Sequence, residues 1–130
     1  MQESANHWQP CEVLPHAAPM ILIDEVIEYG AEKMVTALTV PSAGLFNDPA
    51  MNGDVPAWVG IEYMAQTVAA HSGWQARLAG RQPSVGFLLG TRKFATNVSA
   101  FPAGTRLIVS ADEVMQGDNG MAVFECRIEG

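Results

Sequence analysis

The segment from residue 55 to residue 79 predicts one long helix with very few charged side chains on any of its faces. Asp54 or Val55 can cap its start, and Pro56 falls in the first turn, where a backbone N–H has no helical partner. Gly80 and Pro83 provide the stop signal. A helix with few charges is normally buried on most sides, so the other segments of the chain are expected to cover it. Helical spacing predicts a core-facing stripe of six residues: Trp58, Ile61, Ala65, Val68, Ala69 and Ser72.

Strand patterns surround this helix in the sequence, separated by segments rich in Gly, Pro, Asn and Asp. The expected strands are residues 20–29, 33–40, 84–97, 105–115 and 121–129, and residues 41–54 form an irregular loop. In the last strand, Phe124, Cys126 and Ile128 alternate with charged residues, as in a half-buried antiparallel strand. The pattern predicts an α+β fold in which a sheet encloses one helix. At 130 residues the chain is expected to be a single domain, with residues 1–12 a loose N-terminal segment.

Composition excludes several classes of function. A net charge of -7 argues against nucleic-acid binding, which needs a basic surface. No apolar run approaches the ~18 residues of a membrane helix, so no membrane insertion is expected. The N-terminus lacks the features of a signal peptide, and Cys11 and Cys126 form no CxxC motif, which favours reduced thiols in the cytoplasm. No metal-ligand spacing is evident, so we expect no metal and no cofactor.

Two motifs carry a family resemblance. LPHAAPMILID at residues 14–24 resembles the LPHRxPxLLxD opening of the hot-dog β-hydroxyacyl-ACP dehydratases. PAWVGIEYMAQ at residues 56–66 resembles their helix motif, P-G-x-x-x-x-E-x-M-A-Q. The resemblance covers most of the chain and is strongest to the subgroup associated with aryl-polyene products. It implies a hot-dog fold, in which a curved antiparallel sheet wraps a long central helix.

The resemblance also implies an activity and partners. Members of this family dehydrate (3R)-hydroxyacyl thioesters on acyl carrier protein (ACP) to trans-2-enoyl-ACP, in fatty-acid or polyene biosynthesis. The expected partners are therefore acyl carrier protein and the acyl thioester. Pairing of hot-dog domains implies a homodimer or higher homo-oligomer, or a heterodimer with another hot-dog protein.

This sequence departs from the family pattern at two positions. The family carries a catalytic histidine in an H-F-P-G motif, and counting back from Glu62 places Asp48 at that position. The glycine at the family's helix start is Ala57 here. The usual base is therefore missing, and the standard assignment of site residues needs another argument.

Elimination of water needs a base for the C2 proton and an acid for the leaving hydroxyl. Glu62 is the best candidate, because a carboxylate among apolar helix residues is costly unless it has a partner or a task. The alternative is an acidic residue favoured by the helix dipole. Gln66 lies one turn later on the same side, where it can orient the carboxylate and help bind substrate. Backbone N–H groups of Ala57 and Trp58 are the candidates for polarising the thioester carbonyl.

Of the three histidines, His16 is the candidate base. His7 lies in the loose N-terminal segment, and His71 follows Glu62 by nine residues, which places it on the opposite helix face. His16 precedes the first strand, in a segment that the family packs near its substrate tunnel. The alternative is that His16 makes only a structural hydrogen bond.

Arg92 and Lys93 form the densest basic pair of this acidic chain, and they are candidates for docking an acidic carrier protein. They could equally be two solvated strand residues. Two other functions also remain open. In a hot-dog thioesterase, Glu62 would activate water and His16 would be structural. In a non-catalytic acyl-binding subunit, the site would be completed by a partner hot-dog chain.

Overall fold

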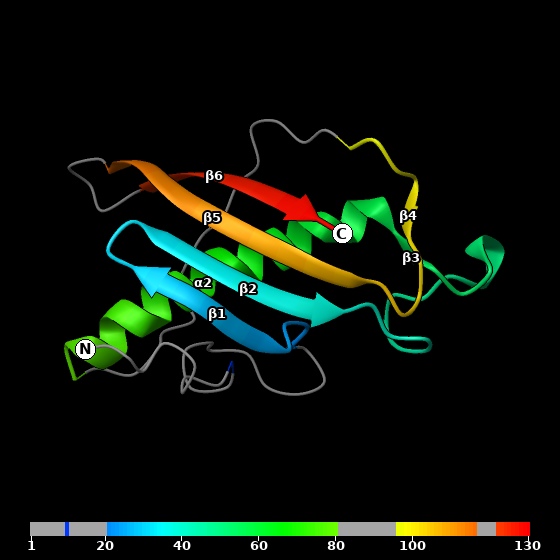
Figure 1. Ribbon diagram of the computed structural model, residues 1–130, viewed down its shortest axis with the longest axis horizontal. Coiled ribbons are helices and arrows are strands. Elements are labelled where there is room, and N and C mark those ends of the chain that lie inside the picture. Colours follow the sequence, from blue (N-terminus) through cyan, green and yellow to red (C-terminus); the bar gives the residue numbers. More distant parts are fainter. Residues whose placement is uncertain (1–9, 11–20, 81–95, 117–121) are drawn as a thin grey trace.

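The computed structural model describes residues 10, 21–80, 96–116 and 122–130. Four strands form an antiparallel sheet in the order β1-β2-β5-β6, and the long helix α2 lies across one face of it (Figure 1). The bounds are β1 Glu25–Gly30, β2 Lys33–Thr39, β5 Arg106–Gln116, β6 Ala122–Glu129 and α2 Gly60–Leu78. The predicted α+β architecture, with one helix against an antiparallel sheet, is confirmed.

The central strands of the sheet are β2 and β5, which pair without interruption from Lys33 opposite Asp112 to Thr39 opposite Arg106. Five consecutive residues of β2 are buried. Side chains alternate between the two faces of a strand, so both faces of β2 are covered in this stretch, one of them by α2. The flanking pairs, β1 with β2 and β5 with β6, each contain a register shift. Such bulges increase local twist, and they help the sheet to curve over α2.

The start of the helix differs from the prediction. Val55–Pro56 form the short strand β3, which pairs with β4 (Ala100–Phe101), and a 3-10 turn, η3 (Ala57–Val59), precedes α2. The predicted cap at Asp54 or Val55 is wrong, because Val55 pairs with Phe101 of β4 and the first helical turn begins only at Ala57. The end of the helix agrees, since Ala79 is the C-cap and Gly80 has a φ of 76°. That left-handed conformation is one that glycine adopts without strain.

The predicted core stripe of the helix is also wrong in part. Val68 and Ala69 are buried, but Trp58 is 62% exposed and the other three residues are partly exposed. The face against the sheet instead carries Tyr63, Gln66, Thr67, Ala70 and Trp74. Residues 66 and 67 on this face are polar, so a pattern based on apolar residues did not indicate that it is the buried face. The broader expectation is confirmed, because nearly all residues from 66 to 76 are buried.

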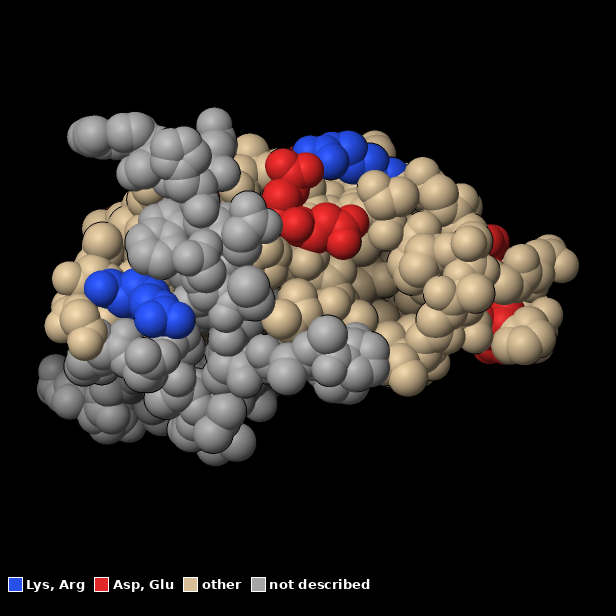
Figure 2. Space-filling model, turned by 90° about the horizontal axis from the view of Figure 1, so that it is seen from below, with Lys and Arg blue, Asp and Glu red and all other residues tan. Residues whose placement is uncertain are grey.

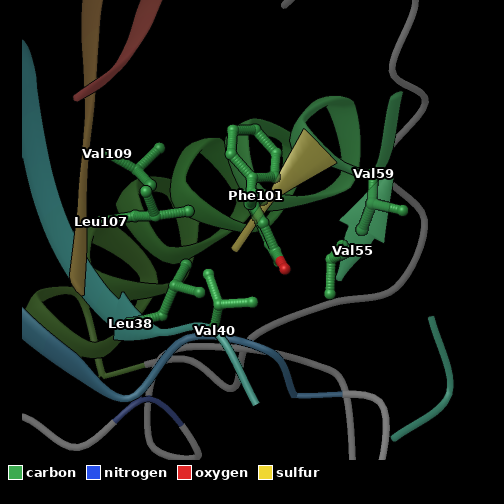
Figure 3. Close-up of a cluster of buried hydrophobic side chains, with 8 residues drawn as sticks. Leu38, Val40, Val55, Val59, Phe101, Leu107 and Val109 are labelled. Carbon is green, nitrogen blue, oxygen red and sulfur yellow. The ribbon is translucent and has the colours of Figure 1, made fainter. Parts of the chain in front are cut away.

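Two apolar clusters join the helix to the sheet. One holds Ile23, Val26, Met34, Ala69, Ala70 and Trp74. The other holds Leu38, Val40, Val55, Val59, Tyr63, Phe101, Leu107 and Val109, and Figure 3 shows these side chains converging between the sheet and the start of the helix. A Cβ on Gly60 would lie 3.1 Å from Ile128 Cδ1 and 3.2 Å from Phe101 Cζ. Glycine at this position lets α2 approach β4 and β6 closely.

The remaining strand predictions have mixed outcomes. Strands at 33–40, 105–115 and 121–129 are confirmed to within one residue. In the last of them, Phe124, Cys126 and Ile128 are partly buried while their neighbours are exposed, as the alternation predicted. The strand expected at 20–29 begins only at Glu25. Residues 84–95 and 1–9 lie outside the described residues. No helix in the described ranges is long and apolar enough to cross a membrane.

Candidate active site

Glu62 lies in the first turn of α2, and its side chain is partly exposed. Its Oε2 accepts a hydrogen bond from Gln66 Nε2 at 3.2 Å, one helical turn further on. The predicted neighbour relation between the two residues is therefore present. A carboxylate held in this way can give or take a proton at a fixed position.

Gln66 is completely buried, with 0% of its surface exposed. Its Oε1 accepts a hydrogen bond of 2.9 Å from the backbone N–H of Leu22. Leu22 belongs to the motif at residues 14–24, so one side chain joins the two motifs that the sequence singled out. The same segment is fixed to the sheet, because Asp24 accepts a 2.7 Å hydrogen bond from the Thr39 N–H.

The start of the helix does not offer both predicted N–H donors. The Ala57 N–H donates to the Ser99 carbonyl at 3.0 Å, so it is already engaged by the segment before β4. A role of the Ala57 N–H at the thioester carbonyl stays a prediction. Trp58 lies one turn before Glu62, and its exposed ring meets Phe46 edge-on at a centroid distance of 6.2 Å.

Asp48, which stands where the family has its histidine, organises a loop. Its Oδ1 accepts a hydrogen bond of 2.9 Å from the Ala50 N–H and thereby caps the 3-10 turn η2 (Pro49–Met51). Its backbone carbonyl accepts from the N–H groups of Met51 and Gly53. Asp48 is therefore a capping residue, which accepts hydrogen bonds from backbone N–H groups at the start of a helical turn.

His71 is 2% exposed, and its Nε2 lies 2.9 Å from the Ala31 carbonyl and 3.2 Å from the Gly30 carbonyl. Carbonyl oxygens only accept, so Nε2 carries the hydrogen. The ring therefore joins α2 to the turn between β1 and β2, as a structural histidine. The other candidates, His7, His16, Arg92 and Lys93, lie outside the described residues, and their roles stay predictions.

Comparison with known proteins identifies the family. A family model described as ApeP-like, ApeP dehydratase, matches residues 8–130. The chain belongs to the ApeP-like dehydratase family. A solved structure, the dehydratase heterocomplex ApeI:P from Xenorhabdus doucetiae, is 31% identical and has a TM-score of 0.84, with 94% of this chain and 81% of that chain covered. A comparison with curated proteins found no match. These findings confirm the resemblance to hot-dog dehydratases.

Tyr63 of this ApeP-like dehydratase belongs to the apolar cluster between the sheet and the start of the helix. Tyr63 follows Glu62 and is 2% exposed; burial, with a smaller contribution from the charge of Asp24, raises the pKa of its phenol to about 12. Tyr63 therefore stays neutral beside Glu62 throughout the physiological range.

The described part of this ApeP-like dehydratase contains no group of three or more His, Cys, Asp or Glu side chains that could hold a metal ion. Of the candidate site residues, the described part brings together Glu62 and Gln66, with the backbone of Leu22. This arrangement suits proton transfer at one carboxylate.

Proposed function

We propose that this ApeP-like dehydratase removes water from (3R)-hydroxyacyl thioesters on acyl carrier protein and forms trans-2-enoyl-ACP. The observation that carries the proposal is the Glu62 carboxylate, which a fully buried Gln66 holds near the start of the enclosed helix. Membership of a dehydratase family supports the reaction class. The two sequence motifs support the ACP thioester and a role in fatty-acid or polyene biosynthesis.

In the proposed reaction a base takes the C2 proton, the C2 electron pair forms the C2–C3 double bond, and the C3–O bond breaks. The hydroxyl leaves with a proton from an acid, so one water is released for each enoyl product. We assign the acid to Glu62 and the base to His16. The Trp58 N–H is the proposed donor to the thioester carbonyl, since the Ala57 N–H is engaged by Ser99. Such a donor stabilises the charge that develops on that oxygen.

Recognition of acyl carrier protein is assigned to Arg92 and Lys93. In the described ranges, Arg106 is paired with Glu25 at 3.0 Å and Lys33 with Glu28 at 3.6 Å. Figure 2 shows basic side chains at two separate places on one face of the molecule, and those at the upper edge lie beside acidic side chains. We propose that the pair Arg92–Lys93 supplies the contact with an acidic carrier.

The decisive experiment incubates the purified protein with a 3-hydroxyacyl-ACP and follows the mass of the carrier. Loss of one water with the thioester intact is the expected result. Release of free carrier thiol without dehydration would instead identify a thioesterase. The reverse reaction, hydration of a 2-enoyl-ACP, gives an independent check because it must use the same site.

A second function is favoured by the loop around Asp48. By the count back from Glu62, Asp48 stands in place of the H-F-P-G histidine, and its carboxylate caps η2. The similar solved structure is a heterocomplex of dehydratases. This chain could therefore be an acyl-binding subunit whose site a second hot-dog protein completes. Dehydration that occurs only when a hot-dog partner is added would support that reading.

A further inference from the structure

We propose that Asn52 is a site of spontaneous deamidation, and that the hydrogen bonds of its loop hold this reaction back until the loop opens. Asn52 precedes Gly53 and is exposed, in the loop between β2 and β3. Figure 1 shows this loop at one end of the molecule, beyond the end of β2. The inference does not depend on the proposed activity, because it concerns the covalent chemistry of the loop itself.

The reaction joins the side chain of Asn52 to the main chain that follows it. The Gly53 nitrogen attacks Cγ of Asn52, so an N–Cγ bond forms, the Cγ–Nδ2 bond breaks, and ammonia leaves with the proton of the Gly53 N–H. One water then opens the five-membered imide and leaves either aspartate or isoaspartate at this position. Glycine favours the attack, because it has no Cβ that would crowd its nitrogen.

The folded main chain keeps the two reacting atoms apart. In the imide ring, Cβ of Asn52 and the nitrogen of Gly53 must lie on the same side of the bond between Cα and the carbonyl carbon. Asn52 has a φ of 58° and a ψ of 28°, and this ψ turns the Gly53 nitrogen nearly to the side opposite Cβ. Two groups of one chain react fast only when their atoms can approach in the right geometry. Ring closure therefore requires another conformation of residue 52.

Hydrogen bonds oppose that change of conformation. The Gly53 N–H, whose nitrogen is the nucleophile, donates to the Asp48 carbonyl at 2.9 Å. The Gly53 carbonyl accepts from Asn47 Nδ2 at 2.6 Å, and the Asp48 carboxylate accepts from the Ala50 N–H at 2.9 Å. Rotation of ψ at Asn52 moves the Gly53 nitrogen and breaks its bond to Asp48. The reactive conformation is therefore reached only by local opening of the loop.

The test incubates the purified protein at mildly alkaline pH and follows Asn52 by peptide mapping with mass spectrometry, through the mass gained when an amide becomes a carboxylate. The same chain unfolded in guanidinium chloride gives the unprotected rate. We expect conversion to be at least about tenfold slower in the folded protein, since only the open fraction reacts. Equal rates in the two states would overturn the proposal, and so would an absence of conversion in the unfolded chain.

Substitutions in the loop test its hydrogen bonds. Asp48→Ala and Asn47→Ala should each raise the folded-state rate at Asn52 about fivefold, because loss of a cap or of a side-chain hydrogen bond makes local opening easier by about that factor. Asp48→Asn is the matched control, since it keeps an oxygen to accept from Ala50 and should keep the parental rate. Unchanged rates in both alanine variants would refute the role of these hydrogen bonds.

A second Asn-Gly pair, Asn119–Gly120, serves as an internal reference in the same digests, and it lies outside the described residues. Its rate should be equal in the parental protein and in Asp48→Ala, because the cap of η2 acts within its own loop. Faster conversion at both pairs would indicate global unfolding instead of loop opening, which contradicts the proposal.

Hydrogen exchange of the Gly53 N–H tests the same loop without any variant. We expect this amide to exchange at least about tenfold more slowly in the parental protein than in an unstructured chain, because its hydrogen is bonded to the Asp48 carbonyl. Exchange at the unprotected rate would show that the loop does not hold the nucleophile, and the proposal would then be wrong.

Discussion

At the scale of single residues, the hydrogen bonds of the acidic side chains distinguish the candidate site from its surroundings. Glu62 is partly exposed and accepts from Gln66, whereas the carboxylate of Asp48 is engaged in a turn of its own loop. Two acidic residues close in sequence to the helix start therefore have different tasks. Their substitution should separate activity from stability.

Glu62→Gln should reduce the turnover of a 3-hydroxyacyl-ACP by at least about 10²-fold, the usual contribution of a general acid or base. The substitution preserves side-chain shape, so the melting temperature should change little. Glu125→Gln, on the exposed face of β6, is the control and should keep full activity. Near-parental turnover in Glu62→Gln would remove this residue from the mechanism.

Asp48→Ala should lower the free energy of unfolding by about 1 kcal/mol, since it removes the side-chain cap from Ala50. Asp48→Asn keeps an acceptor oxygen and should be close to the parental protein in both stability and kcat. Urea unfolding and the dehydration assay measure the two quantities. A large loss of kcat in Asp48→Asn would instead assign Asp48 a chemical role.

At the scale of the elements, a buried pair of hydroxyls links the sheet to the helix. Thr36 of β2 and Thr67 of α2 are 0% exposed, and their Oγ1 atoms are 2.8 Å apart. The Thr67 hydroxyl donates to the Tyr63 carbonyl at 3.0 Å, so its hydrogen is in use. Thr36 must therefore be the donor between the two hydroxyls.

Because Thr36 is the donor and Thr67 the acceptor, substitutions of the two threonines should lower the free energy of unfolding by unequal amounts. Thr67→Val removes the acceptor of the Thr36 hydroxyl and leaves that hydroxyl in the core without a partner. The free energy of unfolding should therefore fall by about 1–3 kcal/mol. Thr36→Val leaves Thr67 with its own acceptor and should cost less. The double variant should be no less stable than Thr67→Val. Urea unfolding of the three variants checks this order, and a costlier Thr36→Val would reverse the assigned donor.

The elements also show how far the sequence could be used for prediction. Alternation ending at Pro41 predicted the strand at 33–40, and the turn segments on either side predicted the strand at 105–115. The capping signals misplaced the helix start, since the pairing of Val55 with Phe101 is a long-range contact with no local signature. Glu62 and Gln66 were predicted as neighbours from their spacing. The Leu22 contact was not, because the backbone donor of a distant segment leaves no mark in the sequence.

At the scale of the whole molecule, stability should depend on alkaline pH. Burial raises the pKa of Tyr63 from 10.0 to about 12, and burial with the nearby charge of Asp112 raises the pKa of the Cys126 thiol from 9.0 to about 11. The unfolded chain ionises first in both cases. Each group therefore contributes fully to the free energy of unfolding below its pKa in the unfolded chain, and this contribution is lost as the pH rises toward its pKa in the folded protein.

The free energy of unfolding should consequently fall between about pH 9 and pH 12, with Tyr63 contributing at most about 1.4 kcal/mol per pH unit. Tyr63→Phe should flatten the decline above pH 10, and Cys126→Ala should flatten it between pH 9 and pH 11. Urea unfolding at each pH measures the slopes. Parallel curves for the parental protein and Tyr63→Phe would contradict the buried neutral phenol.

Assembly belongs to the same scale. We expect the protein to be at least a dimer at micromolar concentration, because the open edge of a sheet is normally covered. The heterocomplex formed by a similar dehydratase makes a mixed hot-dog pair the leading arrangement to test beside a homodimer. Sedimentation of the protein alone and with such a partner measures both. A fully active monomer would exclude either assembly.

The strand order β1-β2-β5-β6 also has a consequence for how the chain is synthesised. The partner of β2 on its inner side is β5, which the ribosome adds only after the whole of α2. Until then, one edge of β2 is unpaired, and the apolar cluster around Leu38 and Tyr63 lacks Leu107 and Val109 of β5. We therefore expect nascent chains that stop near residue 80 to be bound by chaperones and cut by proteases, with protection arising only once β5 has left the exit tunnel.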